Sequence, residues 1–303
     1  LLRSRSAGYD VAPNDVDMVG PLASKHMRRQ DPPSFERSLS AGIRAQDIEL
    51  AAFNGFDFSS RTGRRDHAAA TLGHSATLRG GEFGAQDRSR GAPDLRRILS
   101  LSKFEFEDGW PDSGGEPWMV AWIVPIKDQT GRGRGYPIAV QRRGGPVGSD
   151  AVCAYDATRA WWGMRVAEVG AQVESRPSST VPGGRTVFCR SGAPLFVNDA
   201  GDLWRTVDTK VLAKSLAKAV GKNPADVGGK AFRVGGAIDW RAWLGDAEGE
   251  RILQERGRWD STTERVYARP MLTTHLRASA LVGGARGTSI EDAFPYFVQP
   301  AFR

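Results

Sequence analysis

Hydrophobic and polar positions recur with different periods along the chain, and these periods predict both helices and strands. The clearest helix is predicted over 206–220, where apolar residues return to one face and Gly221 supplies a stop signal. The residues expected to face inward on it are Val207, Val211, Leu212, Leu216, Ala219 and Val220. Helical spacing also predicts helices over 35–43, 66–78, 154–172, 231–244 and 248–256. Helices therefore dominate the predicted fold.

Strand patterns are concentrated in the middle of the chain. Phe104 and Phe106 alternate with glutamates, and the leucines just before them alternate in the opposite phase, which predicts a break or a bulge. Residues 117–126 are almost continuously apolar, as in a buried strand, and the turn residues after them predict a hairpin returning along 136–140. Residues 173–193 are rich in Ser, Pro and Gly and are predicted to form a loop. The fold class expected is α+β, mainly helical, with a small antiparallel sheet packed on a helical bundle.

Composition and charge narrow the classes of protein without selecting one. The chain has 40% hydrophobic and 25% charged residues, which is the composition of a globular protein. Its net charge of +7 is compatible with a polyanionic partner such as nucleic acid, but many proteins without such a partner are equally basic. The sequence has no run of about 18 apolar residues and no visible signal peptide, so no membrane association is expected.

The cysteines and histidines offer no metal site. Cys153 and Cys189 are too few for a tetrahedral site, and reduced thiols indicate an intracellular protein. The histidines have no metal-ligand spacing, and His74 is interpreted as a core residue or as support for a site. Neither a P-loop nor Rossmann glycine spacing is present. The sequence therefore predicts no metal and no small-molecule cofactor.

The most specific chemistry lies in residues 229–269. Lys230 and Arg233 are three positions apart, hence neighbours on one helical face, and small or apolar residues surround the arginine. A Gly-Arg-Trp turn ends at Trp259, and Tyr267 follows it on a short predicted helix. Arginines can hold the non-bridging oxygens of a phosphodiester while a tyrosine hydroxyl attacks phosphorus. The order of these residues suits cleavage of DNA without metal.

This segment resembles the C-terminal boxes of the tyrosine recombinase (phage integrase) family, in the forms found in mobile elements. The resemblance implies that Arg233 grips the scissile phosphate and that Tyr267 is the nucleophile. The family's His-x-x-Arg motif has Lys230 at its histidine position, as in the related type IB topoisomerases. A lysine can still contact phosphate, but it cannot act as a neutral imidazole base. Either Trp259 or Arg258 corresponds to the next family position, with Trp259 slightly preferred.

The resemblance continues upstream with an arginine and a lysine. Residues 78–83, LRGGEF, resemble the family's first box, which implies that Arg79 clamps the phosphate. Lys127, just after the apolar strand, resembles the hairpin lysine that protonates the 5′ leaving oxygen. A competing first box, 163–168, would make Arg165 the arginine instead. Chain order favours Arg79, because the competing box would leave Lys127 upstream of its arginine.

Three regions follow from the resemblance. Residues 1–35 are expected to be a linker or the remnant of a truncated N-terminal DNA-binding domain. Residues 36–275 are expected to be the catalytic domain, and 276–303 a tail that could dock on a neighbouring protomer. The chain begins without methionine, which indicates a piece of a longer product.

The function implied is that of a site-specific DNA recombinase or integrase, which cleaves and rejoins DNA through a 3′-phosphotyrosyl intermediate without metal or ATP. The partners implied are double-stranded DNA and further copies of the chain on that DNA. The location implied is intracellular and DNA-associated, in the nucleus if the source is a eukaryote. One alternative is a catalytically inactive DNA-binding remnant of a mobile-element recombinase. Another is a basic α+β protein with no DNA role, in which Arg79, Arg233 and Tyr267 lie far apart.

Overall fold

The chain of the computed structural model is divided into two units, Leu1–Leu39 and Ser40–Arg303. The residues that the structure describes are 41–85, 95–107, 116–124, 135–143 and 150–244, with side chains described up to residue 240. All of them belong to the second unit, Ser40–Arg303, and the fold given below is that of this unit.

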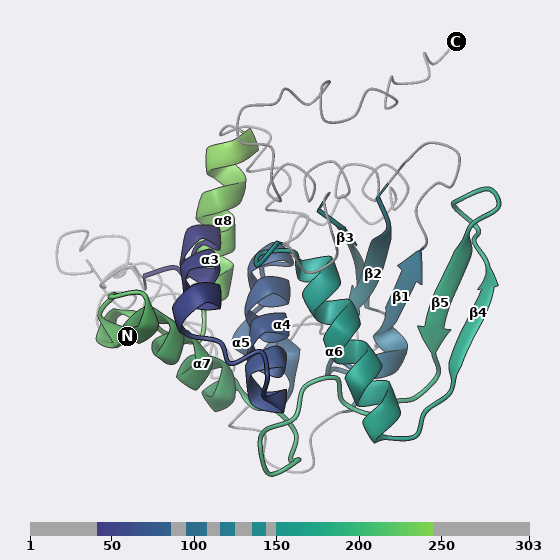
Figure 1. Ribbon diagram of the computed structural model, residues 1–303, viewed down its shortest axis with the longest axis horizontal. Coiled ribbons are helices and arrows are strands. Elements are labelled where there is room, and N and C mark those ends of the chain that lie inside the picture. Colours follow the sequence, from purple (N-terminus) through teal and green to yellow (C-terminus); the bar gives the residue numbers. More distant parts are fainter. Residues whose placement is uncertain (1–40, 86–94, 108–115, 125–134, 144–149, 245–303) are drawn as a thin grey trace, which may run out of the picture. The chain divides into compact units, whose positions relative to one another are not determined.

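A five-stranded antiparallel sheet has the strand order β3-β2-β1-β5-β4 (Figure 1). Its strands are β1 (Phe104–Glu107), β2 (Trp118–Ile123), β3 (Tyr136–Gln141), β4 (Val173–Pro177) and β5 (Arg185–Cys189). The predicted buried strand and its hairpin are confirmed, because β2 pairs with β3 from Trp118↔Gln141 to Ile123↔Tyr136. The predicted phase break before β1 is also present as a 3₁₀ helix, η2 (Leu101–Lys103).

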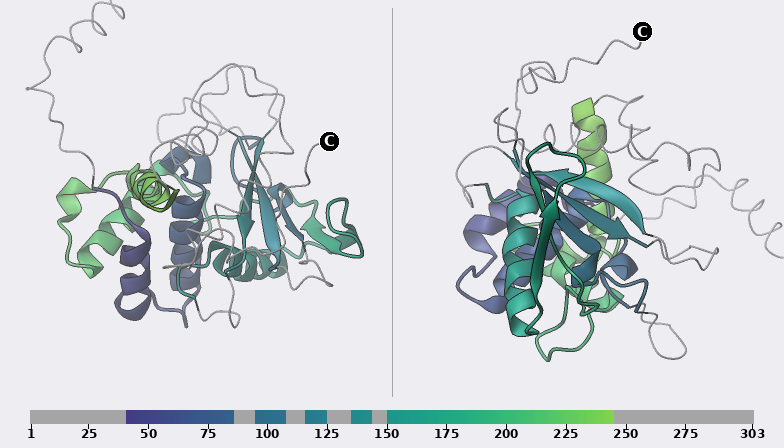
Figure 2. Two further views of the ribbon diagram at one scale, coloured as in Figure 1. Left: turned by 90° about the horizontal axis from the view of Figure 1, so that it is seen from above. Right: turned by 90° about the vertical axis from the view of Figure 1, so that its right-hand side faces the viewer.

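The prediction of a loop over 173–193 is wrong, because this segment forms the β4–β5 hairpin. β5 pairs with β1, and β4 lies at the end of the sheet away from α3 and α7 (Figures 1 and 2). Most β4 side chains are exposed, and cross-strand ion pairs join Glu174 to Arg190 and Arg176 to Glu105. A strand exposed on both faces needs no apolar alternation, so its sequence carried no strand signal.

Helices form the rest of the described structure. They are α3 (Ala45–Asn54), α4 (Arg61–Ser75), α5 (Gly80–Phe83), α6 (Ala154–Glu168), α7 (Thr206–Ala219), α8 (Ala231–Leu244) and the 3₁₀ helix η3 (Pro224–Asp226). The helices predicted over 154–172 and 231–244 are confirmed, the first ending at Glu168. No helix in the described ranges is long and apolar enough to cross a membrane.

Two helix predictions need correction at their beginnings. The helix predicted over 66–78 begins earlier, at Arg61, because the Ser60 hydroxyl caps it by accepting a hydrogen bond from Gly63 N–H at 3.0 Å. The helix predicted over 35–43 is wrong in its described part, since residues 41–44 are not helical. There the backbone N–H of Ile43 donates to the carbonyl of Ala231 at 3.0 Å. This hydrogen bond holds the segment against α8 and replaces a bond within a helix. The helix predicted over 248–256 lies outside the described residues.

α7 forms where it was predicted, but a different face of it is buried. Val207 and Val211, expected to face inward, are 48% and 61% exposed, and only Leu212 and Leu216 of the predicted set are buried. The buried positions of α7 are Thr209, Leu212, Ala213, Leu216 and Ala217. The Thr209 hydroxyl accepts a hydrogen bond from the indole N–H of Trp204 at 2.8 Å. Because this hydroxyl is satisfied, threonine takes the core position that apolar pattern alone assigned to valine.

The main core begins between the sheet and α6 and continues through α4 to α3, α5, α7 and α8 (Figure 1). Its large members include Phe104, Phe106, Met119, Ile138, Trp161 and Trp162. Both indole N–H groups are satisfied, Trp161 by the carbonyl of Leu195 at 2.9 Å and Trp162 by that of Leu101 at 3.0 Å. The described residues thus form a mixed α+β fold with a small antiparallel sheet, as expected.

His67 on α4 should make the stability of this core depend on pH. Its Nε2 lies 2.6 Å from the carbonyl oxygen of Ala151, and its ring meets those of Phe56 and Phe58 edge-on. Burial lowers the pKa of His67 and outweighs the hydrogen bond to Ala151. As pH falls below about 6.5, the unfolded chain takes up a proton first, so we expect the free energy of unfolding to decrease until the folded pKa is passed.

The variant His67→Gln tests this dependence, since an amide can still donate to Ala151 without titrating. Urea denaturation at a series of pH values should give a flatter profile below pH 6.5 for the variant than for the wild type. Equal slopes in the two proteins would show that His67 is not responsible.

Candidate functional site

The two predicted arginine boxes, far apart in the sequence, lie against each other in the structure. Nη1 of Arg233 donates a hydrogen bond to the carbonyl oxygen of Thr77 at 3.2 Å, two residues before Arg79. A Cβ placed on Gly80 would be 3.1 Å from the carbonyl oxygen of Gly229, just before Lys230. Residues 78–83 and the start of α8 are therefore direct neighbours.

The first turn of α8 positions the second box. Lys230 immediately precedes the helix and is exposed, whereas Arg233 is buried with only 8% exposure. A Cβ on Gly236 would be 2.3 Å from the carbonyl oxygen of His74, and one on Gly235 would be 1.8 Å from that of Ile43. A side chain at Gly236 would push α8 away from the end of α4, and one at Gly235 would push it away from the segment before α3. The small residues after Arg233 thus serve close approach of the backbones.

Arg79 is held by a glutamate within its own box. It precedes the short helix α5, and the buried Glu82 accepts from both its backbone N–H at 2.8 Å and its Nη1 at 3.2 Å. The Arg79 side chain retains 23% exposure while that of Glu82 has none. The guanidinium is therefore anchored on one side and accessible in part, which is suitable for binding an anion.

The N-terminal end of α7 supports both boxes. If Gly80 carried a Cβ, that atom would lie 3.1 Å from the methyl carbon Cγ2 of Thr206. A Cβ on Gly229 would lie 3.6 Å from the same methyl carbon. Oγ1 of Thr209 also lies 3.4 Å from the carbonyl oxygen of Gly80. One helix end thus fixes the distance between the two boxes.

The buried carboxylate of Asp239 joins three helices through hydrogen bonds and an ion pair. One carboxylate oxygen of Asp239 on α8 accepts from Nε2 of His74 and from the backbone N–H of Ala45, both at 2.8 Å. The other accepts from the Arg44 guanidinium at 2.7 and 2.6 Å. Burial raises the pKa of Asp239, but the hydrogen bond and attraction of His74, the Ala45 N–H and Arg44 together hold it below its ordinary value. The interpretation of His74 as a core residue is confirmed, since it is 2% exposed.

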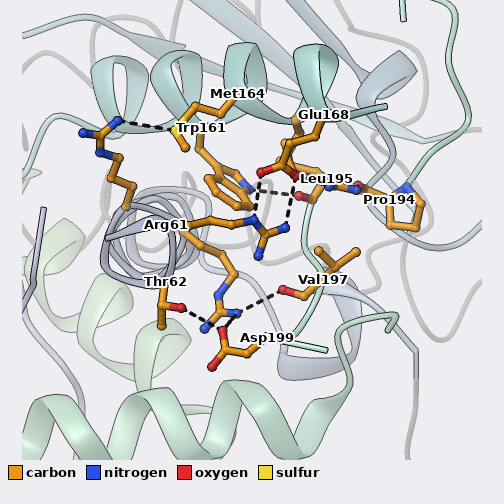
Figure 3. A network of polar contacts seen from close by, with 12 residues as sticks. Arg61, Thr62, Trp161, Met164, Glu168, Pro194, Leu195, Val197 and Asp199 are labelled. Carbon is orange, nitrogen blue, oxygen red and sulfur yellow. Dashed lines mark hydrogen bonds and ion pairs between the residues drawn. The ribbon is translucent and has the colours of Figure 1, made fainter. Parts of the chain in front are cut away.

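The competing arginine, Arg165, serves a different purpose. It forms an ion pair with Glu168 on its own helix α6 and donates to the carbonyl of Pro194 at 3.3 Å. Glu168 also accepts two hydrogen bonds from Arg61 of α4, at 2.8 and 3.1 Å (Figure 3). Arg165 therefore joins α6 to the segment before α7, and its partner Glu168 joins α6 to α4, whereas Arg79 borders the second box.

Half of the predicted site lies outside the described residues. Lys127 belongs to the connection between β2 and β3, and Trp259, its alternative Arg258, and Tyr267 follow α8. Arg79, Lys230 and Arg233 are the described members, and the chain segments that carry them are in contact. Within the described ranges, no group of three or more His, Cys, Asp or Glu residues could hold a metal ion.

Sequence reasoning missed two residues that shape this site, Asp239 and Thr77. Asp239 lies between Ile238 and Trp240 on a helix otherwise rich in apolar residues, and a lone acid in such a setting is a signal of a buried ion pair. Thr77 carried no signal, because its role depends on a backbone conformation that side-chain patterns do not encode.

The described residues define an α+β protein in which the segment of Arg79 contacts the segment that leads into α8. Comparisons of the chain with family models, with curated proteins and with solved structures found no match. The chemistry of the site is therefore inferred from its own residues and motifs.

Proposed function

We propose that this protein is a tyrosine recombinase that cleaves and rejoins double-stranded DNA through a covalent 3′-phosphotyrosyl intermediate. The observation that supports the proposal best is the contact between the box of Arg79 and the box of Lys230 and Arg233. Two distant segments with this chemistry need not meet in an unrelated fold. Their meeting speaks against a protein in which these arginines are ordinary surface charges.

In the proposed reaction, the Tyr267 hydroxyl releases its proton to solvent water, and its oxygen attacks the phosphorus of the scissile phosphodiester. A bond forms between the phenolic oxygen and phosphorus, and the bond from phosphorus to the 5′ oxygen breaks. Lys127 gives a proton to that leaving oxygen, while Arg79 and Arg233 stabilise the charge on the non-bridging oxygens. The new ester conserves the energy of the old one, so rejoining needs neither ATP nor a metal.

The geometry of the described cations suits a phosphate. Arg233 is buried and oriented by a backbone carbonyl, so its charge acts where water screens it little. Lys230 precedes the first turn of α8, whose N-terminal end favours an anion. Trp259 would complete the pocket.

The nucleophile can be tested with a pool of nicked duplexes of randomised sequence, from which the released 5′-hydroxyl strand diffuses away before rejoining. We expect the wild-type protein to form a covalent protein–DNA adduct in the presence of EDTA, detected on a denaturing gel. Tyr267→Phe removes only the attacking hydroxyl and should form no adduct, whereas the control Tyr296→Phe should form it normally. An adduct with Tyr267→Phe would show that another residue is the nucleophile.

A catalytically inactive DNA-binding remnant is the second candidate function. Lys230 favours it, because a lysine replaces the histidine that could act as a base in the family. DNA binding by the wild-type protein without any adduct would select this candidate. Assembly of several copies on DNA, docking of 276–303 on a neighbour, and an intracellular location stay predictions.

A further inference from the structure

Helix α4 ends in an unusual way just before Arg79. The N–H of Leu78 donates to the carbonyl of Gly73 at 2.9 Å, and that of Thr77 donates to His74 at 3.2 Å. These two bonds form a Schellman motif, which places Thr77 in the left-handed region with φ of 48°. Glycine normally occupies this position, and a β-branched residue there is strained. In the part of the chain that the structure describes, Thr77 is the one non-glycine residue with positive φ.

The side chain of Thr77 adds a second unfavourable feature. The residue is 1% exposed, and its hydroxyl oxygen Oγ1 is buried without a hydrogen-bond partner. Glycine at this position would remove both the strain and the unpartnered hydroxyl. The threonine is therefore not explained by the need to end α4.

What Thr77 does contact is the second arginine box. Its carbonyl oxygen accepts the hydrogen bond from Nη1 of Arg233, at 3.2 Å. Its methyl carbon Cγ2 would be 3.2 Å from a Cβ on Gly236, so the side chain packs where α8 passes closest to α4. The backbone and the side chain of one strained residue thus both meet α8 within one turn of Arg233.

We propose that Thr77 is a positioning residue for Arg233. The β-branched side chain, packed against α8, prevents the peptide after Thr77 from turning, so its carbonyl stays directed at the guanidinium. Glycine would end α4 with less strain but would leave this peptide free to rotate. This inference rests on the proposed function for its effect on cleavage, whereas the order of the Arg233 side chain can be measured without it.

The decisive comparison is between Thr77→Gly and Thr77→Val in the full chain. Thr77→Gly should be at least as stable as the wild type to urea and should bind duplex DNA equally well. Its rate of adduct formation should fall about tenfold, the effect expected from loosening one hydrogen bond of a charged donor. Thr77→Val keeps the β-branch and should restore the rate to within about threefold of wild type. Equal rates in wild type and Thr77→Gly would overturn the proposal, as would a rate loss in Thr77→Gly that parallels a loss of stability.

A spectroscopic measurement separates this inference from the proposed function. The guanidinium protons of Arg233 can be identified in ¹⁵N spectra by their loss in Arg233→Lys. Their exchange with water should be about tenfold faster in Thr77→Gly than in wild type, and near wild type in Thr77→Val. If the wild-type protein forms no adduct, the proposed function fails, and this exchange comparison alone supports or overturns the positioning role. Unchanged exchange in Thr77→Gly would overturn it.

Discussion

Asp239→Asn is expected to lower the free energy of unfolding by about 3–5 kcal/mol, because it removes a buried carboxylate that is paired with Arg44. Arg44 would then face an amide that cannot neutralise it, and this amide cannot accept the hydrogen bonds of both Arg44 and His74. The backbone N–H of Ala45, at the start of α3, also donates to Asp239, and its hydrogen bond would be weakened. Urea denaturation at neutral pH measures this difference directly. The same substitution at the exposed Asp202 is a matched control and should change stability by less than about 0.5 kcal/mol.

The pH dependence of stability in wild type and in Asp239→Asn shows whether the lost stability comes from the lost charge. The pKa of Asp239 is lowered in the folded protein, so its contribution to stability is present above the ordinary value of 3.8 and is lost as pH falls through the folded pKa. The difference in stability between wild type and Asp239→Asn should therefore shrink as the pH falls below about 4. A difference that stays constant down to the acid limit would indicate lost packing rather than a lost charge.

The predictability of the fold from the sequence depended on where each element lies. β2 and α8 are buried on most sides, so their runs of apolar residues were enough to predict them. The β4–β5 hairpin could not be found in this way, because backbone pairing of β5 with β1 stabilises it while most side chains of β4 are exposed. The face of α7 was misjudged for a related reason, since the hydrogen bond between Trp204 and Thr209 makes a polar position a buried one.

For the site, motif order predicted which segments meet but not how they are held. The boxes of Arg79 and Arg233 could be proposed as neighbours because the family resemblance assigns phosphate binding to both, and the two segments do lie in contact. The ion pair and hydrogen bonds of Asp239 and the strained turn at Thr77 depend on packing between helices that are distant in the sequence. Such contacts leave no periodic pattern, and a single sequence gives no other signal of them.

Under the proposed recombinase function, Arg233→Ala should separate cleavage from DNA binding. We expect the rate of adduct formation to fall about 10²–10³-fold, the effect of removing one pre-oriented donor to a developing negative charge. DNA affinity should change by less than about threefold, because backbone binding is shared among many cations. Rapid-quench measurement of the adduct, together with anisotropy titration of labelled duplex, gives both quantities.

The control for Arg233→Ala is Arg190→Ala, which removes an arginine that is 78% exposed on β5's end and pairs with Glu174. It changes the net charge by the same amount, so the salt dependence of DNA binding should be similar in the two variants, whereas only Arg233→Ala should lose cleavage. Urea denaturation must accompany both, because Arg233 also satisfies the carbonyl of Thr77. If Arg233→Ala is folded and cleaves as fast as Arg190→Ala, the guanidinium does not contact the reacting phosphate. The contact between the boxes would then be a feature of packing alone, and the assignment of Arg79 as its partner in catalysis would fall with it.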